Sequence, residues 1–285
     1  FHLLAKGKVP AFLGSSFVFL AGYFAIAPNG ERELLPYACF GVMVAGLLYL
    51  VLAAFFKVFG MKKVMRFFPP IVTGPIIIAI GLSLSGSAIT NCSANWGIAL
   101  VAILIVIGFN IWGKGMAKII PILLGVIGSY AVAALTGNVD FTAVREAAWI
   151  GLPFQMQDTL FGLFAGEVDK GLLLTAVVTI APLSLATMTE HIGDMCAISS
   201  TCGRNFMEDP GFHRTLLGDG LATTLASLFG APANTTYGEN TGVLALSKVY
   251  DPRVIRIAAY FAIVFSFCPK FAALISAMPA ATIGG

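Results

Sequence analysis

The sequence predicts an all-α membrane protein that crosses the bilayer several times. Of its 285 residues, 58% are hydrophobic and only 11% are charged, whereas about 25% of the residues in a soluble domain are charged. Apolar runs of about 20 residues, each long enough to cross the hydrocarbon core, recur along the chain. The formal net charge of +3 is too small to indicate binding of nucleic acid.

Nine helical or partly helical segments are expected, because each is an apolar run bounded by polar, Gly or Pro residues. Their approximate bounds, in chain order, are 11–27, 35–59, 69–89, 96–112, 119–135, 172–199, 216–229, 239–249 and 254–267.

The second, fourth and fifth segments are continuous apolar runs that predict ordinary spans. The third begins at Pro69-Pro70, and the ninth follows Pro252, as is common at a helix start. The sixth and seventh carry acidic residues within apolar sequence. The first contains Gly14-Ser15-Ser16, and the sequence around the eighth, near 234–242, is interrupted by Pro232, Gly238 and Gly242. Two short, interrupted segments at separated places are typical of a transporter's midplane binding site.

Basic residues gather in loops on one side of the predicted topology, which the positive-inside rule makes the cytoplasmic side. The long loop 136–170 is then external. Five cysteines are spread without a C-x-x-C pair, so free thiols and no metal site are expected. The chain starts at Phe1 without a methionine and stops just after apolar residues 271–278, so both ends look cut from a longer transporter.

Four acids lie in or beside apolar spans: Glu190, Asp194, Asp219 and Glu239. An ionised group at bilayer depth costs at least ~2.5 kcal/mol, so such residues usually bind substrate or carry protons. Glu190 and Asp194 are four residues apart and share one helix face. Two neighbouring carboxylates raise each other's pKa, so one of them could hold a proton. The alternative is an internal polar cluster that only ties helices together.

Two further polar residues leave their roles open. His191 follows Glu190 and points about 100° away around the helix, so a packing or interhelical hydrogen-bonding role is favoured over proton transfer. Asp219 lies between Gly218 and Gly220, where close helix packing could hide it, and a structural role and a functional role both remain open. An extended backbone around 14–19 could offer N–H groups to a ligand, and Tyr237 could lay its ring against a planar substrate.

The chain resembles the nucleobase:cation symporter family 2, also called nucleobase-ascorbate transporters, and within it the bacterial uracil permeases. The resemblance is carried by five ordered motifs: KGKVPAFLGSSFVF at 6–19, FPPIVTGPIIIAIGLSLSG at 68–86, TEHIGD at 189–194, DPGFHRTLLGDGLATTLASLFG at 209–230 and NTTYGENTGVLALSKVY at 234–250.

The resemblance implies an inverted-repeat fold of seven plus seven segments, with a core domain, a gate domain and two short mid-membrane strands. This chain would hold roughly segments three to eleven. Residues 1–60 and 171–285 would then belong to the core, and residues 61–170 to the gate. Similar proteins are often homodimers that contact through the gate.

The motifs also imply a binding site. Glu190 and Glu239 match two carboxylates that hydrogen-bond the uracil ring in similar permeases. Phe17 and Gly238 match positions whose backbone N–H groups meet uracil carbonyls, and both would lie in the short strands. The last two matches are Tyr237, which corresponds to an aromatic residue flanking the base, and Asn240, which completes the motif.

Two acids bear on specificity and coupling. Asp194 stands where the best-known bacterial uracil carrier has His, although other relatives have an acid there. Asp219 matches an acid typical of purine-transporting relatives and of some uracil carriers. Glu239 favours uracil, because purine-transporting relatives more often have Gln at its position. The proton-coupling candidates are therefore Glu190, Asp194, Glu239 and Asp219.

We thus expect proton-coupled uracil uptake by alternating access across the cell membrane, with the proton as coupling ion and no cofactor. A xanthine or uric acid permease of the same family is the first alternative. An anion transporter of related fold is less favoured, because the two glutamates argue against it. An intramembrane enzyme would need a nucleophile–base or metal constellation, and no recognised spacing of His, Ser and Cys indicates one.

Overall fold

The structure is a computed structural model that describes residues 1–165 and 168–285. For ten residues in the helices the structure describes the backbone but not the side chain: 70, 72, 73, 76, 77, 80, 83, 84, 165 and 239. The chain forms two compact units, each made of two stretches. The first unit contains residues 1–77 and 154–259, and the second contains residues 78–153 and 260–285. The assignment of residues 1–60, 61–170 and 171–285 to core and gate stays a prediction.

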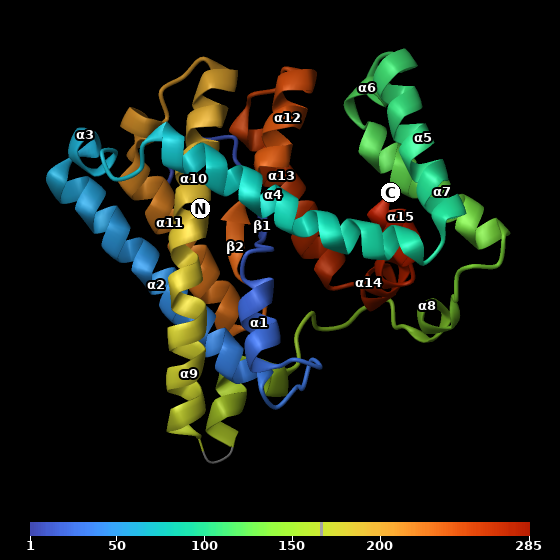
Figure 1. The fold of residues 1–285 in the computed structure, drawn as a ribbon, viewed down its shortest axis with the longest axis horizontal. Coiled ribbons are helices and arrows are strands. Elements are labelled where there is room, and N and C mark those ends of the chain that lie inside the picture. Colours follow the sequence, from blue (N-terminus) through green and yellow to red (C-terminus); the bar gives the residue numbers. More distant parts are fainter. Residues whose placement is uncertain (166–167) are drawn as a thin grey trace. The chain divides into compact units, whose positions relative to one another are not determined.

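Most of the described chain is helical, with one pair of short strands (Figure 1). The elements in the first half of the chain are β1 (Leu13–Ser15), α1 (Leu20–Ile26), α2 (Leu35–Phe59), α3 (Met61–Val64), α4 (Pro70–Ser93), α5 (Trp96–Trp112), α6 (Met116–Ile119), α7 (Pro121–Leu135) and α8 (Thr142–Glu146). Those in the second half are η1 (Met156–Asp158), η2 (Leu160–Ala165), α9 (Lys170–Ile180), η3 (Ala181–Leu183), α10 (Ser184–Cys202), η4 (Met207–Gly211), α11 (Phe212–Leu228), β2 (Asn234–Thr236), α12 (Gly238–Ser247), α13 (Pro252–Ser266), α14 (Pro269–Ser276) and α15 (Ala280–Gly284).

The structure has helix in every predicted segment, and the bounds of α2 and α5 agree with the prediction residue for residue. Local chemistry explains these ends. α2 has Pro36 in its first turn and is followed by the C-cap residue Gly60, which has φ of 78°, a value that glycine adopts without strain. The Asn95 side chain caps α5 by accepting a hydrogen bond from the N–H of Ile98 at 3.2 Å.

The two interrupted segments each form a strand followed by a short helix. β1 leads to α1, and β2 leads to α12. The segment predicted at 172–199 is also divided, because the 3₁₀ turn η3, which contains Pro182, separates α9 from α10. Proline lacks an N–H and disturbs the hydrogen-bond pattern of a helix interior.

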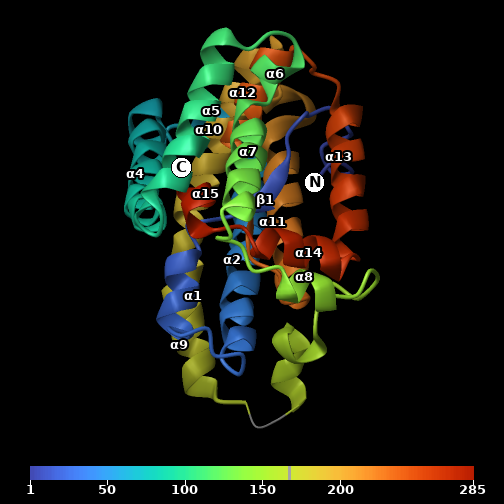
Figure 2. The same cartoon turned by 90° about the vertical axis from the view of Figure 1, so that its right-hand side faces the viewer.

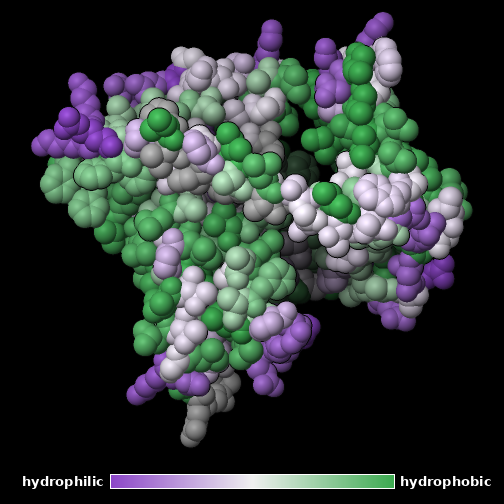
Figure 3. Space-filling model, in the orientation of Figure 1, coloured by the Kyte–Doolittle hydropathy of each residue, from purple (hydrophilic) through white to green (hydrophobic). Residues whose placement is uncertain are grey.

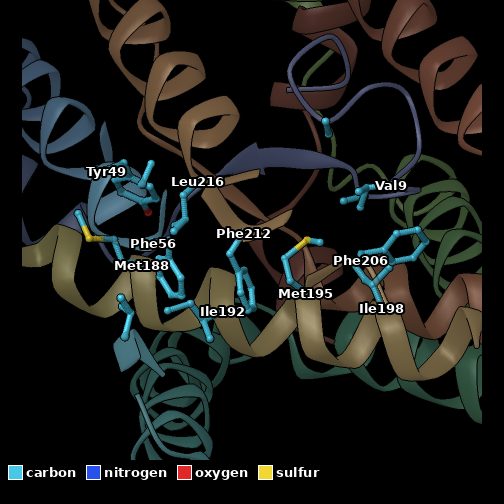
Figure 4. Close-up of a cluster of buried hydrophobic side chains, with 14 residues drawn as sticks. Val9, Tyr49, Phe56, Met188, Ile192, Met195, Ile198, Phe206, Phe212 and Leu216 are labelled. Atoms are coloured by element: carbon cyan, nitrogen blue, oxygen red, sulfur yellow. The ribbon is translucent and has the colours of Figure 1, made fainter. Parts of the chain in front are cut away.

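In the first unit, α2 packs closely against α11. A Cβ at Gly46 would lie 2.8 Å from the carbonyl oxygen of Gly220, and a Cβ at Gly220 would lie 2.4 Å from the Cβ of Tyr49. The two helix backbones therefore approach each other where both lack side chains. Next to this contact, residues of α10 face residues of α2 and α11 in a buried cluster (Figure 4). Its labelled members from these three helices are Tyr49, Phe56, Met188, Ile192, Met195, Ile198, Phe212 and Leu216.

In the second unit, α5 and α7 pack side by side (Figure 2). A Cβ at Gly125 of α7 would meet Val106 of α5 at 2.5 Å, so this glycine allows the close approach. α15 also packs on α5, where Ala281 joins a small buried cluster with Ile98 and Ala99.

The described helices have the composition of a membrane protein. α2 and the stretch Lys170–Cys202, in which α9, η3 and α10 follow one another directly, are long and apolar enough to cross a membrane. α13 with α14, which are bent by 95°, would add a third span if they form one. Hydrophobic side chains cover much of the visible face of the first unit, and hydrophilic ones gather around α3 (Figure 3). Val58 and Phe67, for example, are 73% and 80% exposed, which fits a surface in contact with lipid.

Candidate functional site

The site is organised by the antiparallel pair of β1 and β2. Gly14 lies opposite Thr235, and Ser15 lies opposite Asn234. Two further backbone hydrogen bonds extend the pair, from Ser16 N–H to Ala233 at 2.7 Å and from Tyr237 N–H to Phe12 at 3.0 Å. Both interrupted segments are thereby held together in the first unit.

Helix α10 supplies the acidic side of the site. The hydroxyl of Thr235 on β2 donates a hydrogen bond to Oε2 of Glu190 at 3.2 Å. Thr235 is 4% exposed, so this bond anchors Glu190 to a buried part of the strand. Glu190 therefore lies beside the second interrupted segment, and its role in substrate binding stays a prediction.

Asp194, one turn further along α10, lies against the start of α12. A Cβ at Gly238 would be 2.9 Å from Oδ1 of Asp194. The first N–H groups of a helix have no partner within the helix, and its N-terminus carries partial positive charge. Glu190 therefore contacts β2 at Thr235, and Asp194 lies against the N-terminus of α12 at Gly238.

Tyr237, between β2 and α12, is fixed on the first strand. Its hydroxyl donates a hydrogen bond to the carbonyl oxygen of Ser15 at 2.9 Å and lies 3.3 Å from the Ser15 hydroxyl. Its ring occupies the space where a Cβ of Gly14 would be. The ring thus packs across the two strands, and whether it also flanks a substrate stays a prediction.

The prediction that Phe17 and Gly238 lie in the strands is wrong. Phe17 follows β1 by two residues and is 50% exposed, and Gly238 is the first residue of α12. The backbone pairing extends as far as Ser16 and Tyr237, and after these residues the two segments lead into α1 and α12. Asn240 lies in the first turn of α12, with its N–H donated to the Tyr237 carbonyl at 3.2 Å. The Glu239 side chain lies outside the described residues, although its backbone belongs to α12.

Behind the strands, His191 joins three elements of the first unit. Its Nδ1 lies 2.9 Å from the hydroxyl oxygen of Thr236 on β2 and 3.0 Å from Oδ2 of Asp219 on α11. The side chains of His191 and Asp219 are fully buried. His191 thus hydrogen-bonds a strand and lies beside a second helix, and the predicted burial of Asp219 is confirmed.

Sequence reasoning missed Thr235, Thr236 and Tyr49. Tyr49 of α2 is buried and donates to the hydroxyl of Thr187 on α10 at 2.6 Å. A threonine or tyrosine in an apolar span gives no local signal of its partner. The adjacent pair Thr235-Thr236, next to a predicted site and facing a predicted Glu-His pair, is the one pattern that could have indicated these contacts.

The comparison with known proteins decides the family. A sequence model described as "Permease family" matches residues 1–285. The chain belongs to this permease family, nucleobase:cation symporter-2.

Several curated members of the permease family are similar over the whole of this chain. A protein named uracil permease from Bacillus caldolyticus is 37% identical over 294 residues, which are 100% of this chain and 66% of that protein. The uracil permease of Bacillus subtilis is also 37% identical, with 99% and 66% covered. A probable uracil permease of Haemophilus influenzae is 35% identical, with 100% and 67% covered.

The chain thus spans about two thirds of the length of the permeases it matches. Proteins named permeases are transporters and not enzymes. Membership of the permease family, together with the apolar helices, identifies the chain as part of a membrane protein.

Proposed function

We propose that a carrier containing this chain takes up uracil together with protons, by alternating access, as a multi-pass protein of the cell membrane. The observation that carries the proposal is the contact of Glu190 with Thr235, on the strand that runs into α12. It sets a carboxylate beside the strand that leads into the N-terminus of a helix. The names of the similar permeases add support.

The chemistry of this arrangement suits a uracil ring. Uracil has two ring N–H donors and two carbonyl acceptors. A carboxylate such as that of Glu190 accepts from ring N–H groups, and backbone N–H groups at the start of α12 donate to carbonyl oxygens. Phe17, Tyr237, Asn240 and Glu239 complete the proposed site, and the lipid bilayer surrounds it.

Proton coupling is proposed for the acids of the site. Glu190 and Asp194 lie one turn apart on α10, with Asp219 joined to α10 through His191. Together with Glu239 they are the candidate proton carriers. We further propose that residues 1–60 and 171–285 move as a core against a gate that includes residues 61–170, in a carrier that forms a homodimer.

Uptake measurements test the proposal. The full-length carrier is reconstituted in liposomes, and entry of labelled uracil is followed with and without an imposed proton gradient. We expect uracil to accumulate only with the gradient, and Glu190→Gln to abolish accumulation. Accumulation without a gradient would contradict the coupling. An excess of unlabelled xanthine should leave uracil entry unchanged, whereas strong competition would favour the purine alternative.

A further inference from the structure

The junction between α10 and β2 has a second contact beside the proposed uracil site. Glu190 and His191 are consecutive on α10, and they contact the consecutive hydroxyls of Thr235 and Thr236. Successive side chains of a strand point to opposite faces. The two contacts therefore hold β2 from both faces, one at the site and one in the protein interior.

The inner contact is fully enclosed. Thr236 is 1% exposed, and His191 and Asp219 are 0% exposed. Nδ1 of His191 reaches both partners, with 2.9 Å to the Thr236 hydroxyl oxygen and 3.0 Å to Oδ2 of Asp219. One nitrogen atom thus links α10, β2 and α11.

Asp219 gives this histidine a defined orientation. Among the described residues, neither carboxylate oxygen of Asp219 has a hydrogen bond of ordinary geometry, and its short distance to His191 compensates in part for its burial. A hydrogen on Nδ1 has two acceptors, because Oδ2 of Asp219 and the Thr236 hydroxyl oxygen both lie within 3.0 Å of that nitrogen. The same N–H is then available to the Thr236 hydroxyl.

The position of β2 also sets the positions of Tyr237 and Gly238, the two residues directly after it. The ring of Tyr237 spans the strands, and Gly238 packs against Asp194. Asp194 and Glu190 share a face of α10. A shift of β2 along α10 would move the N-terminus of α12 relative to both acids.

We propose that His191 is a positioning residue for uracil binding: through Thr236 it fixes β2 against α10 and so sets the N-terminus of α12 against the face of α10 that carries Glu190 and Asp194. The proposal rests on the proposed binding of uracil at Glu190 and α12. Neither His191 nor Thr236 contacts the substrate in this proposal.

Substitutions at Thr236 test the role directly. Thr236→Val keeps the shape and removes the hydroxyl, and Thr236→Ser keeps the hydroxyl. Loss of one hydrogen bond that holds the site corresponds to about a threefold to tenfold rise in the KM for uracil. We expect this rise for Thr236→Val, with the maximal rate per carrier in the membrane unchanged, and rescue by Thr236→Ser.

A double variant separates positioning from general stability. His191→Phe replaces the imidazole with a ring that lacks nitrogen. If both residues act through their mutual contact, Thr236→Val combined with His191→Phe raises KM no further than His191→Phe alone. Additive effects on KM, or a fall in maximal rate alone, would overturn the proposal.

The outcome for Glu190 keeps the two proposals distinguishable. If Glu190→Gln weakens uracil binding while Thr236→Val has the KM of the unmodified carrier, the positioning role of His191 fails and the uracil site stands. If Glu190→Gln binds uracil normally, the proposed site itself fails.

Discussion

The ring of Tyr237 fills the space beside Gly14: a Cβ at Gly14 would lie 2.3 Å from Cζ of that ring and 2.6 Å from its hydroxyl oxygen. The same hydroxyl donates to the Ser15 carbonyl at 2.9 Å, so the ring cannot move aside without breaking a hydrogen bond. The absence of a side chain at Gly14 is thus what allows an aromatic ring to lie across the two strands.

Gly14→Ala should displace the Tyr237 ring. Overpacking of this kind costs about 1–3 kcal/mol, and we expect lower thermal stability of the purified carrier and weaker uracil binding. Gly108→Ala is the control, since a Cβ at Gly108 meets nothing within 4 Å. Equal melting temperatures for the two variants would show that the ring has room to yield.

Gly238→Ala should disturb the contact between α12 and Asp194, because the new methyl group would lie 2.9 Å from Oδ1 of Asp194. We expect about a tenfold or greater rise in the KM for uracil, a loss of at least ~1.4 kcal/mol of binding free energy. Gly242→Ala lies in the same helix, where a Cβ meets nothing within 4 Å, and should leave folding intact. An unchanged KM for Gly238→Ala would show that the contact between α12 and Asp194 does not affect uracil binding.

Gly220→Val should loosen the packing of α11 on α2. Even a Cβ at Gly220 would lie 2.4 Å from the Cβ of Tyr49 and 2.7 Å from the carbonyl oxygen of Gly46, so backbone atoms must move. We expect destabilisation of about 1–3 kcal/mol or more, measured as a lower unfolding temperature in detergent. Gly86→Val, at a position where a Cβ meets nothing within 4 Å, provides the comparison, and a similar loss there would contradict the close approach.

The contact of Lys8 with Asp209 should make stability depend on pH. The hydrogen bond from the Lys8 ammonium is the largest cause that lowers the pKa of the Asp209 carboxyl. A carboxyl whose pKa is lowered on folding adds stability above its unfolded pKa of about 3.9, and that stability is lost as the pH falls through the folded value. Melting temperatures of the unmodified protein and Lys8→Met should therefore differ by a constant amount from pH 8 to about pH 5 and converge below about pH 4.

Lys62→Met removes an equal charge from the helical turn α3 and serves as the control for this pH dependence. Its difference from the unmodified protein should not converge over the same range. If both variants behave alike below pH 4, the effect belongs to net charge and not to Asp209.

Helix bounds, interruptions and shared helix faces could be predicted from the sequence, because local sequence patterns determine them. The bounds of α2 and α5 follow from uninterrupted apolar runs. The run of α2 is followed by Gly60, and the run of α5 lies between Asn95 and Gly113. The interruption of the first and eighth segments follows from Gly, Ser and Asn residues, which disfavour continuous helix. The common helix face of Glu190 and Asp194 follows from their spacing.

Contacts between residues far apart in the sequence could not be predicted from local sequence patterns. Thr235 reaches Glu190, and Thr236 reaches His191, across 45 positions of the chain. The exact ends of the strands depend on pairing between segments more than 200 residues apart. The resemblance placed Phe17 and Gly238 in these strands, and the structure places both just beyond the strand ends.

The most direct measurement of the central claim is the equilibrium binding of uracil to purified carrier with Glu190→Gln. Loss of a hydrogen bond to a charged group corresponds to about 10- to 100-fold weaker binding. Glu146→Gln, at the end of α8 in the second unit, should bind as the unmodified carrier does. A uracil affinity for Glu190→Gln equal to that of Glu146→Gln would contradict the assignment of Glu190 to the substrate site.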